Sequence, residues 1–169
     1  MAEKKVVIIL PFRGFDEQTY RAVRQTLERR GHKVTTAGLF PGTAEAADGS
    51  SVPVELRLRD IKTWQYDGYV FLGGEGVRSF FEDEDARKLA KDISYKTVAA
   101  TGDAVALLAM AGAFKKKKVT GPTDWFDLLK RNQAVVTGRP LEVDEKVITA
   151  QDGEVAQQFA NAIADALSR

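Results

Sequence analysis

Residues 98–114, VAATGDAVALLAMAGAF, join a strand-like segment to an apolar helix at a point where many α/β enzymes carry their nucleophile. The β-type run 96–100 meets Thr101-Gly102-Asp103, and an alanine-rich helical segment follows at once. Such a sharp turn lifts one side chain above the sheet, beside the free N–H groups that open the helix. The apex of the turn is Gly102, which has no side chain. The segment therefore has the layout of a nucleophile elbow without a nucleophile.

Glycine at this apex has a physical explanation. The backbone of an elbow apex is strained, which costs a residue with a Cβ about 1–3 kcal/mol. Glycine adopts such angles freely. Gly102 is therefore typical of a turn that has kept its shape after losing its side-chain chemistry, and it is equally typical of a simple tight turn before a helix.

Two acidic residues are candidates for chemistry near this turn. Asp103 is expected to cap the helix that follows it, where a carboxylate gains roughly 0.3–1 kcal/mol from the helix dipole. The alternative places Asp103 in a pocket, approached across the sheet edge by Glu75. Two carboxylates in one pocket would raise one pKa and form a general acid/base pair. Both interpretations stay open.

The segment Gly73-Gly74-Glu75-Gly76 follows a strand-like run and is rich enough in glycine to present backbone N–H groups. It has neither the P-loop spacing nor the dinucleotide-binding spacing. It can still offer N–H groups to a small anion, with Arg78 and Arg13 adding positive charge; a plain tight turn is the alternative. The predicted binding residues are Gly73, Gly74, Glu75, Gly102 and Asp103.

Several kinds of chemistry lack their residues in this chain. It has no cysteine, which excludes disulfides, thiolate metal sites and cysteine catalysis. His32 is the only histidine, and its place between a helix and a strand predicts a solvated turn residue. A Ser-His-Asp triad or a zinc site cannot be assembled from these parts. No metal and no cofactor are predicted.

Composition limits the partners and the location. The chain has 169 residues, 44% of them hydrophobic, which fits a single domain, 1–169. Its 25 basic and 24 acidic residues leave no strong field toward nucleic acid or an anionic membrane. The short apolar run 6–10 after two lysines is typical of a buried first strand rather than of a signal peptide, and no window approaches the ~20 apolar residues of a membrane span. We therefore expect no nucleic-acid or membrane partner and a cytoplasmic protein.

Strand and helix signals alternate along the chain, which predicts an α/β fold with a mostly parallel sheet and helices on both faces. Residues 40–51 are expected to form an irregular loop or a small hairpin turning at Asp48-Gly49. Trp125 and Phe126 are expected to pack on a helix or at a subunit contact, and Trp64 and Tyr66 to close the lower core. The expected strands are 6–10, 32–39, 69–72, 96–100, 118–121, 134–137 and 146–150, and the expected helices are 16–30, 83–93, 103–111 and 154–167.

Four segments in order, 6–19, 29–39, 66–76 and 98–121, resemble the ThiJ/PfpI superfamily, and 147–167 is similar to its closing strand and helix. The resemblance covers nearly the whole chain. It implies a flavodoxin-like, three-layer α/β sandwich of the class I glutamine amidotransferase-like type. It also implies a homo-oligomer, usually a dimer and sometimes a hexamer.

The catalytic pattern of that superfamily is not retained. Its elbow cysteine falls on Gly102, the histidine that often follows falls on Asp103, and its helix glutamate falls on Thr19. The resemblance therefore implies an atypical member without cysteine-dependent deglycase, protease or amidotransferase activity, acting as a small-ligand-binding or protective interaction protein. The alternative is a divergent hydrolase, lyase or glyoxalase-like enzyme that uses Asp103 and Glu75 as acid and base with the Gly73-Gly74 amides. The sequence fits both natural loss and deliberate removal of the cysteine.

Overall fold

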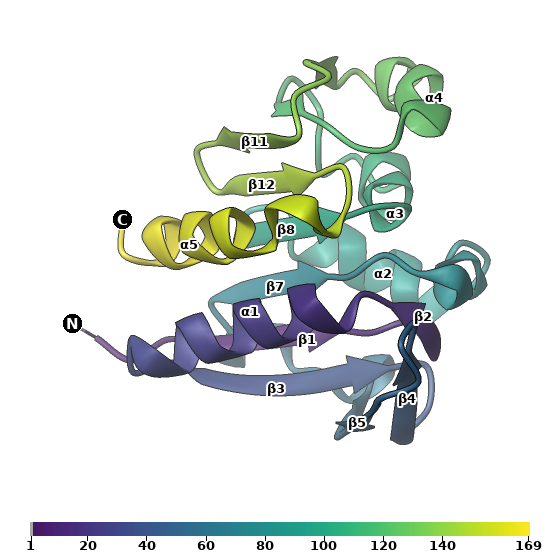
Figure 1. The fold of residues 1–169 in the computed structure, drawn as a ribbon. Coiled ribbons are helices and arrows are strands. Elements are labelled where there is room, and N and C mark those ends of the chain that lie inside the picture. The colour runs from purple at the N-terminus through teal and green to yellow at the C-terminus, as the bar shows by residue number, and fades with distance from the viewer. Residues whose placement is uncertain (1) are drawn as a thin grey trace.

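The computed structural model describes residues 2–169, and its centre is one mostly parallel sheet (Figure 1). The order of its strands is β11 (Leu141–Asp144), β12 (Val147–Ala150), β8 (Thr97–Thr101), β7 (Gly68–Phe71), β1 (Lys5–Ile9), β3 (Lys33–Gly38) and β6 (Leu56–Arg57). Neighbouring strands pair in parallel, except that β11 runs antiparallel to β12. The apolar runs of β1, β7 and β8 are buried along their length because both faces of the sheet are covered.

Helices cover both faces, which confirms the predicted fold class. One face carries α1 (Glu17–Arg29) and α5 (Ala156–Leu167), which pack on each other and on the inward side chains of β1. The opposite face carries α2 (Glu84–Asp92), α3 (Ala104–Met110) and α4 (Phe126–Arg131). The two layers of helices lie on either side of the sheet in Figure 1. None of the helices in residues 2–169 is long and apolar enough to cross a bilayer.

Several short strands and helices lie around this core. The expected hairpin is confirmed as β4 (Gly42–Ala46) and β5 (Ser51–Val54), and β2 (Arg13–Phe15) pairs with β4. The expected strands 118–121 and 134–137 shorten to β9 (Lys118–Val119) and β10 (Val135–Val136), which pair only with each other. The remaining short helices are η1 (Leu58–Asp60), η2 (Thr63–Gln65), η3 (Glu75–Phe80), η4 (Thr123–Trp125) and η5 (Gly153–Val155).

Two sequence predictions about these elements were incomplete or wrong. Strands β2 and β11 were not predicted, because each has few buried side chains and lies at the periphery. Trp64 does not close the core: its ring is 73% exposed on η2. The prediction is confirmed for Tyr66, which packs against the core with its ring edge-on to Tyr69 at 6.2 Å between centroids.

The strand order has a topological switch point at the carboxyl ends of β1 and β7. After β1 the chain crosses through α1 to β3 on one side of β1, whereas β7 lies on the other side of β1 and leads to α2 on the opposite face. Loops that leave neighbouring parallel strands in opposite directions open a crevice at the sheet edge, where α/β proteins place their ligands. Gly73 and Gly74 follow β7 at this point.

Candidate functional site

The turn between β8 and α3 holds Gly102 at its apex. Its φ is +55°, in the left-handed region that favours glycine. The Gly102 N–H donates to the carbonyl of Ala150 at 3.2 Å, which fixes the turn against β12. A Cβ built on Gly102 would lie 3.6 Å from the Cα of Gly73, an ordinary van der Waals separation. The apex therefore has room for a side chain, and its cost would come from the backbone angle alone.

The Gly73-Gly74 turn brings backbone segments into direct contact. A Cβ on Gly73 would lie 2.6 Å from the carbonyl oxygen of Thr101, and one on Gly74 would lie 2.7 Å from the carbonyl carbon of Gly14. The Gly73 N–H donates to Oγ1 of Thr101 at 3.1 Å. The turn thus ties together β2 and the ends of β7 and β8, and one of its two glycine amides already has an intramolecular acceptor.

Asp103 begins α3, but its carboxylate does not cap the helix, so this prediction was wrong. Its φ of −65° and ψ of −15° are helical, whereas a capping side chain normally requires extended angles. The carboxylate instead accepts a hydrogen bond from Nε1 of Trp125 at 2.7 Å. A half-buried indole N–H needs an acceptor, and Asp103 supplies one.

Trp125 is the centre of a contact group that we call the indole cluster: Asp103, Trp125, Arg78 and Phe81. The guanidinium carbon of Arg78 lies 5.2 Å from the centroid of the Trp125 ring. The ring of Phe81 meets the Trp125 ring edge-on, with centroids 5.7 Å apart. Sequence reasoning expected Trp125 to pack on a helix but did not connect it to Asp103, because the two residues are 22 positions apart. The only signal in the sequence was a tryptophan in a loop segment, since an indole N–H needs an acceptor when it is buried.

Glu75 has a different partner. Its Oε1 lies 3.1 Å from the Arg13 guanidinium, in an ion pair open to solvent. Arg13 also lies over the ring of Phe12, at 5.4 Å from the centroid. Within residues 2–169 no hydrogen bond joins Glu75 to Asp103. The two candidate acid/base residues are therefore each held by another side chain.

Thr19, the residue at which the sequence resemblance places a glutamate, belongs to the N-terminal cap of α1. Its N–H and its hydroxyl both donate to Oδ2 of Asp16. Gly153 packs closely against this pair, since a Cβ there would lie 2.3 Å from the same oxygen. Thr19 therefore stabilises the start of the helix, and its side chain is buried.

His32 is not a solvated turn residue, which corrects the sequence prediction. It is 4% exposed, and its Nδ1 accepts a hydrogen bond from the Lys4 N–H at 3.0 Å. The turn after α1 folds the ring against the start of β1, at the edge of the sheet opposite Gly102. Loss of solvent lowers the pKa of His32, and the charges of Lys4 and Arg30 lower it further.

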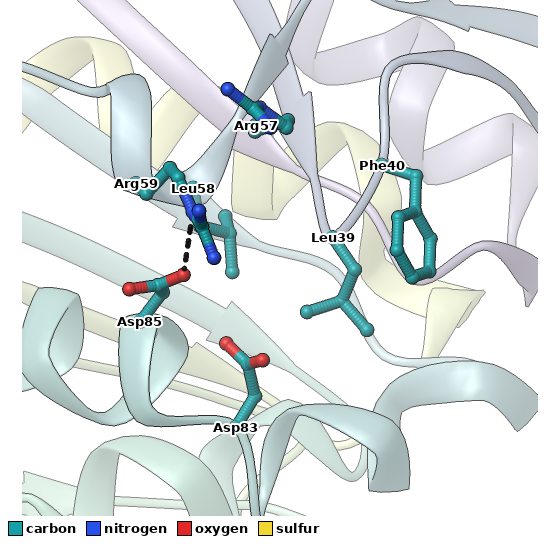
Figure 2. A pocket seen from close by; sticks show the side chains of 7 residues that line it. All are labelled: Leu39, Phe40, Arg57, Leu58, Arg59, Asp83 and Asp85. Carbon is teal, nitrogen blue, oxygen red and sulfur yellow. Dashed lines mark hydrogen bonds and ion pairs between the residues drawn. The ribbon is translucent and has the colours of Figure 1, made fainter.

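A hollow of about 180 Å³ lies at the carboxyl ends of β3 and β6, and its two arginines and two aspartates are shown in Figure 2. Arg59 and Asp85 form an ion pair at 3.2 Å, and Asp83 accepts from the Ala86 N–H at 2.9 Å as the cap of α2. Arg57 pairs with Asp60 at 3.0 Å. The four charged side chains that line the hollow are therefore each bound to a partner within the protein. Its lining residues are Leu39, Phe40, Arg57, Leu58, Arg59, Asp83 and Asp85.

Known proteins are similar to this chain in sequence and in structure. An uncharacterized protein of Methanocaldococcus jannaschii is 25% identical over 100% of this chain and 85% of its own length. Protein dj-1beta of Drosophila melanogaster is 26% identical over 99% of this chain and 91% of its own length. The crystal structure of a ThiJ/PfpI domain protein from Brachyspira murdochii superimposes with a TM-score of 0.90 at 23% identity, covering 97% of this chain and 96% of that one.

The match to a defined family is nearly complete and confirms the resemblance drawn from the sequence. Residues 4–166 match the DJ-1/PfpI family. The flavodoxin-like sandwich agrees with the solved structure of the Brachyspira protein. The chain therefore belongs to the DJ-1/PfpI family.

Proposed function

We propose that this protein is an atypical DJ-1/PfpI member that binds a small anionic or carbonyl ligand and carries out no cysteine-based catalysis. The observation that carries the proposal is Gly102, an apex with an elbow-like backbone and no reactive atom, in a chain without cysteine. A retained turn with an empty apex supports binding better than turnover.

The other candidate groups support the same conclusion. Thr19 is hydrogen-bonded to Asp16, so the first helix presents no acid at that position. Asp103 accepts from Trp125, and Glu75 is paired with Arg13. A general acid or base must reach the reacting atoms, and each of these groups would first have to leave its present partner.

The ligand chemistry follows from the positive groups near the switch point. Arg78 is exposed, lies over Trp125 and forms no ion pair within residues 2–169. Arg13, at the start of β2, is already paired with Glu75 at 3.1 Å, which leaves Arg78 to meet an anionic ligand. Guanidinium groups favour carboxylates because they donate paired N–H bonds in a fixed geometry. We therefore assign the site small carboxylates and oxo-acids, held near Gly74, Gly102 and Arg78.

Members of the family are commonly oligomeric, and we propose a cytoplasmic homodimer or hexamer for this chain. Light scattering of the purified protein would give the assembly directly. A monomer at every concentration would contradict this part of the proposal.

The decisive experiment combines binding with turnover. Thermal unfolding is followed with pyruvate and glyoxylate, and turnover of methylglyoxal and of glycated amino acids is measured on the same preparation. We expect ligand-dependent melting without turnover; a ligand at 100 times its Kd stabilises by about 2.7 kcal/mol. Arg78→Gln should abolish the shift, and Arg131→Gln, an exposed arginine on α4, should leave it unchanged. Turnover that is lost in Asp103→Asn would overturn the proposal in favour of the carboxylate enzyme.

A further inference from the structure

A second hollow lies between α2 and α3, beside the indole cluster. Its volume is about 490 Å³, within the range of small-molecule sites. Its apolar lining consists of Phe81, Leu107, Met110 and Ala111. Met110 is 45% exposed, although it is a large apolar side chain. We call this hollow the α2–α3 groove.

Charged side chains line the groove in order along α2. Glu84, Arg87, Lys88 and Lys91 have the spacing of one helix face, and Glu82 lies just before the helix. Lys88 is bound to Asp92 at 2.6 Å. The other four form no ion pair within residues 2–169. The groove therefore has two unpaired carboxylates at the start of the helix and two unpaired cations toward its end.

Acidic first turns and basic last turns are favoured on any surface helix by the helix dipole. This helix differs because the unpaired charges line a hollow with an apolar floor. Glu84 and Lys88, four residues apart, are placed to pair with each other, yet Lys88 contacts Asp92 instead. The acidic end is thus left open to a positive group from outside.

The length of the charged row restricts what can fit. Glu84 and Lys91 are seven residues apart, which corresponds to about 10.5 Å along a helix. Three residues of extended peptide span about 10–11 Å. We propose that the α2–α3 groove binds a short apolar peptide with free termini, with its ammonium group toward Glu82 and Glu84 and its carboxylate toward Arg87 and Lys91. Its side chains would then lie on Leu107 and Met110.

Other occupants fit the charges less well. A fatty-acid anion would satisfy Arg87 and Lys91 but would lay its tail against two carboxylates. A small inorganic anion would leave the apolar floor uncovered. The dipolar peptide is the occupant that matches both charged ends and the floor between them.

Tri-leucine with free termini is the probe. The chain has two tryptophans, and in a Trp64→Phe background the fluorescence of Trp125 reports on the groove through its contact with Phe81. Calorimetry on the same samples gives the affinity. We expect saturable binding, weakened about fivefold by N-acetylation or by C-amidation, since each removes one exposed ion pair.

Charge reversal on the helix supplies the second arm. Arg87→Glu combined with Lys91→Glu should weaken the free peptide about tenfold or more and should affect the C-amidated peptide much less. Lys130→Glu, on the exposed side of α4, is the matched control and should bind normally. All three positions are exposed, so the variants are expected to fold, which circular dichroism would verify.

Four results would overturn the proposal. They are no binding at millimolar peptide, equal binding of free and blocked peptides, tighter binding of decanoate than of tri-leucine, and self-association through the groove that the double reversal abolishes. The ligand site proposed above includes Arg78, which lies over the same Trp125, and Arg78→Gln tests that site separately.

Discussion

The carboxyl ends and the amino ends of the central strands, which we call the carboxyl edge and the amino edge of the sheet, are held together by different contacts. At the carboxyl edge, where β1, β7 and β8 end, backbone meets backbone, because Gly73 and Gly74 leave no space for a Cβ. At the amino edge, side chains bind the backbone instead. Asp67 accepts from the Lys5 N–H at 2.9 Å, and His32 accepts from the Lys4 N–H at 3.0 Å.

This difference means that the shape of the β8–α3 turn does not depend on which side chain stands at its apex. The carboxyl edge depends on the absence of side chains at two glycines, so a substitution at Gly102 leaves those contacts untouched. The amino edge depends on hydrogen bonds accepted by specific side chains, one of which is the titratable His32, whose pKa is lowered by burial. The carboxyl edge should therefore respond to added volume, and the amino edge to protonation.

The largest expected effect comes from adding volume at the carboxyl edge. Gly73→Ala places a Cβ 2.6 Å from the carbonyl oxygen of Thr101 and 3.0 Å from the amide nitrogen of Asp103, and backbone atoms cannot move aside cheaply. We expect the free energy of unfolding to fall by about 3 kcal/mol, measured by urea denaturation.

Gly102→Ala is the matched control for this comparison. Its Cβ meets only the Cα of Gly73 at 3.6 Å, so its cost is that of the left-handed backbone, about 1–2 kcal/mol. Equal losses in the two variants would show that the apex is as crowded as the turn beside it. The contrast between a closed turn and an open apex would then fail.

Much of the fold could be predicted from the sequence because buried parallel strands are continuous apolar runs. The run 6–10 became Lys5–Ile9, and helix 16–30 became Glu17–Arg29 with Asp16 as its cap. Strand β11 was not predicted, because an edge strand with exposed residues has no such continuous apolar run. The hydrophobic pattern of the sequence thus predicts those elements whose buried residues follow one another or recur at a regular spacing.

The contacts of the site were harder to predict for the same reason. The positive φ of Gly102 follows from its place between a strand and a helix. The partner of Asp103 does not, because Trp125 reaches it from a separate loop. Likewise, the burial of His32 depends on Lys4, which pairs with it across 28 positions. Backbone shape could be inferred from neighbouring residues, whereas side-chain pairing across the fold could not.

A medium effect is expected for the hydrogen bond between the Trp125 and Asp103 side chains at the carboxyl edge. Trp125→Phe and Asp103→Ala each remove half of the 2.7 Å hydrogen bond, and a double-mutant cycle should give a coupling of about 2 kcal/mol. Asp103→Asn should lose less, because its amide oxygen still accepts. The cycle of Trp125→Phe with Glu75→Ala, a pair without contact, should be additive within about 0.5 kcal/mol. Additivity in both cycles would mean that the indole bond adds no stability to this edge.

The smallest effect belongs to the amino edge and depends on pH. Burial lowers the pKa of His32 below its ordinary value, so the unfolded chain binds a proton near pH 6.5 while the folded protein still resists it. The stability that this group contributes is present above pH 6.5 and is lost as the pH falls toward the folded pKa, by no more than about 1.4 kcal/mol for each pH unit. His32→Asn keeps an acceptor for the Lys4 N–H but does not titrate, so its unfolding free energy should fall less than that of the parent protein between pH 7.5 and 5.5. Parallel pH profiles for the two proteins would show that the ring is solvated in the folded state, and the distinction between a steric edge and a titratable edge would be lost.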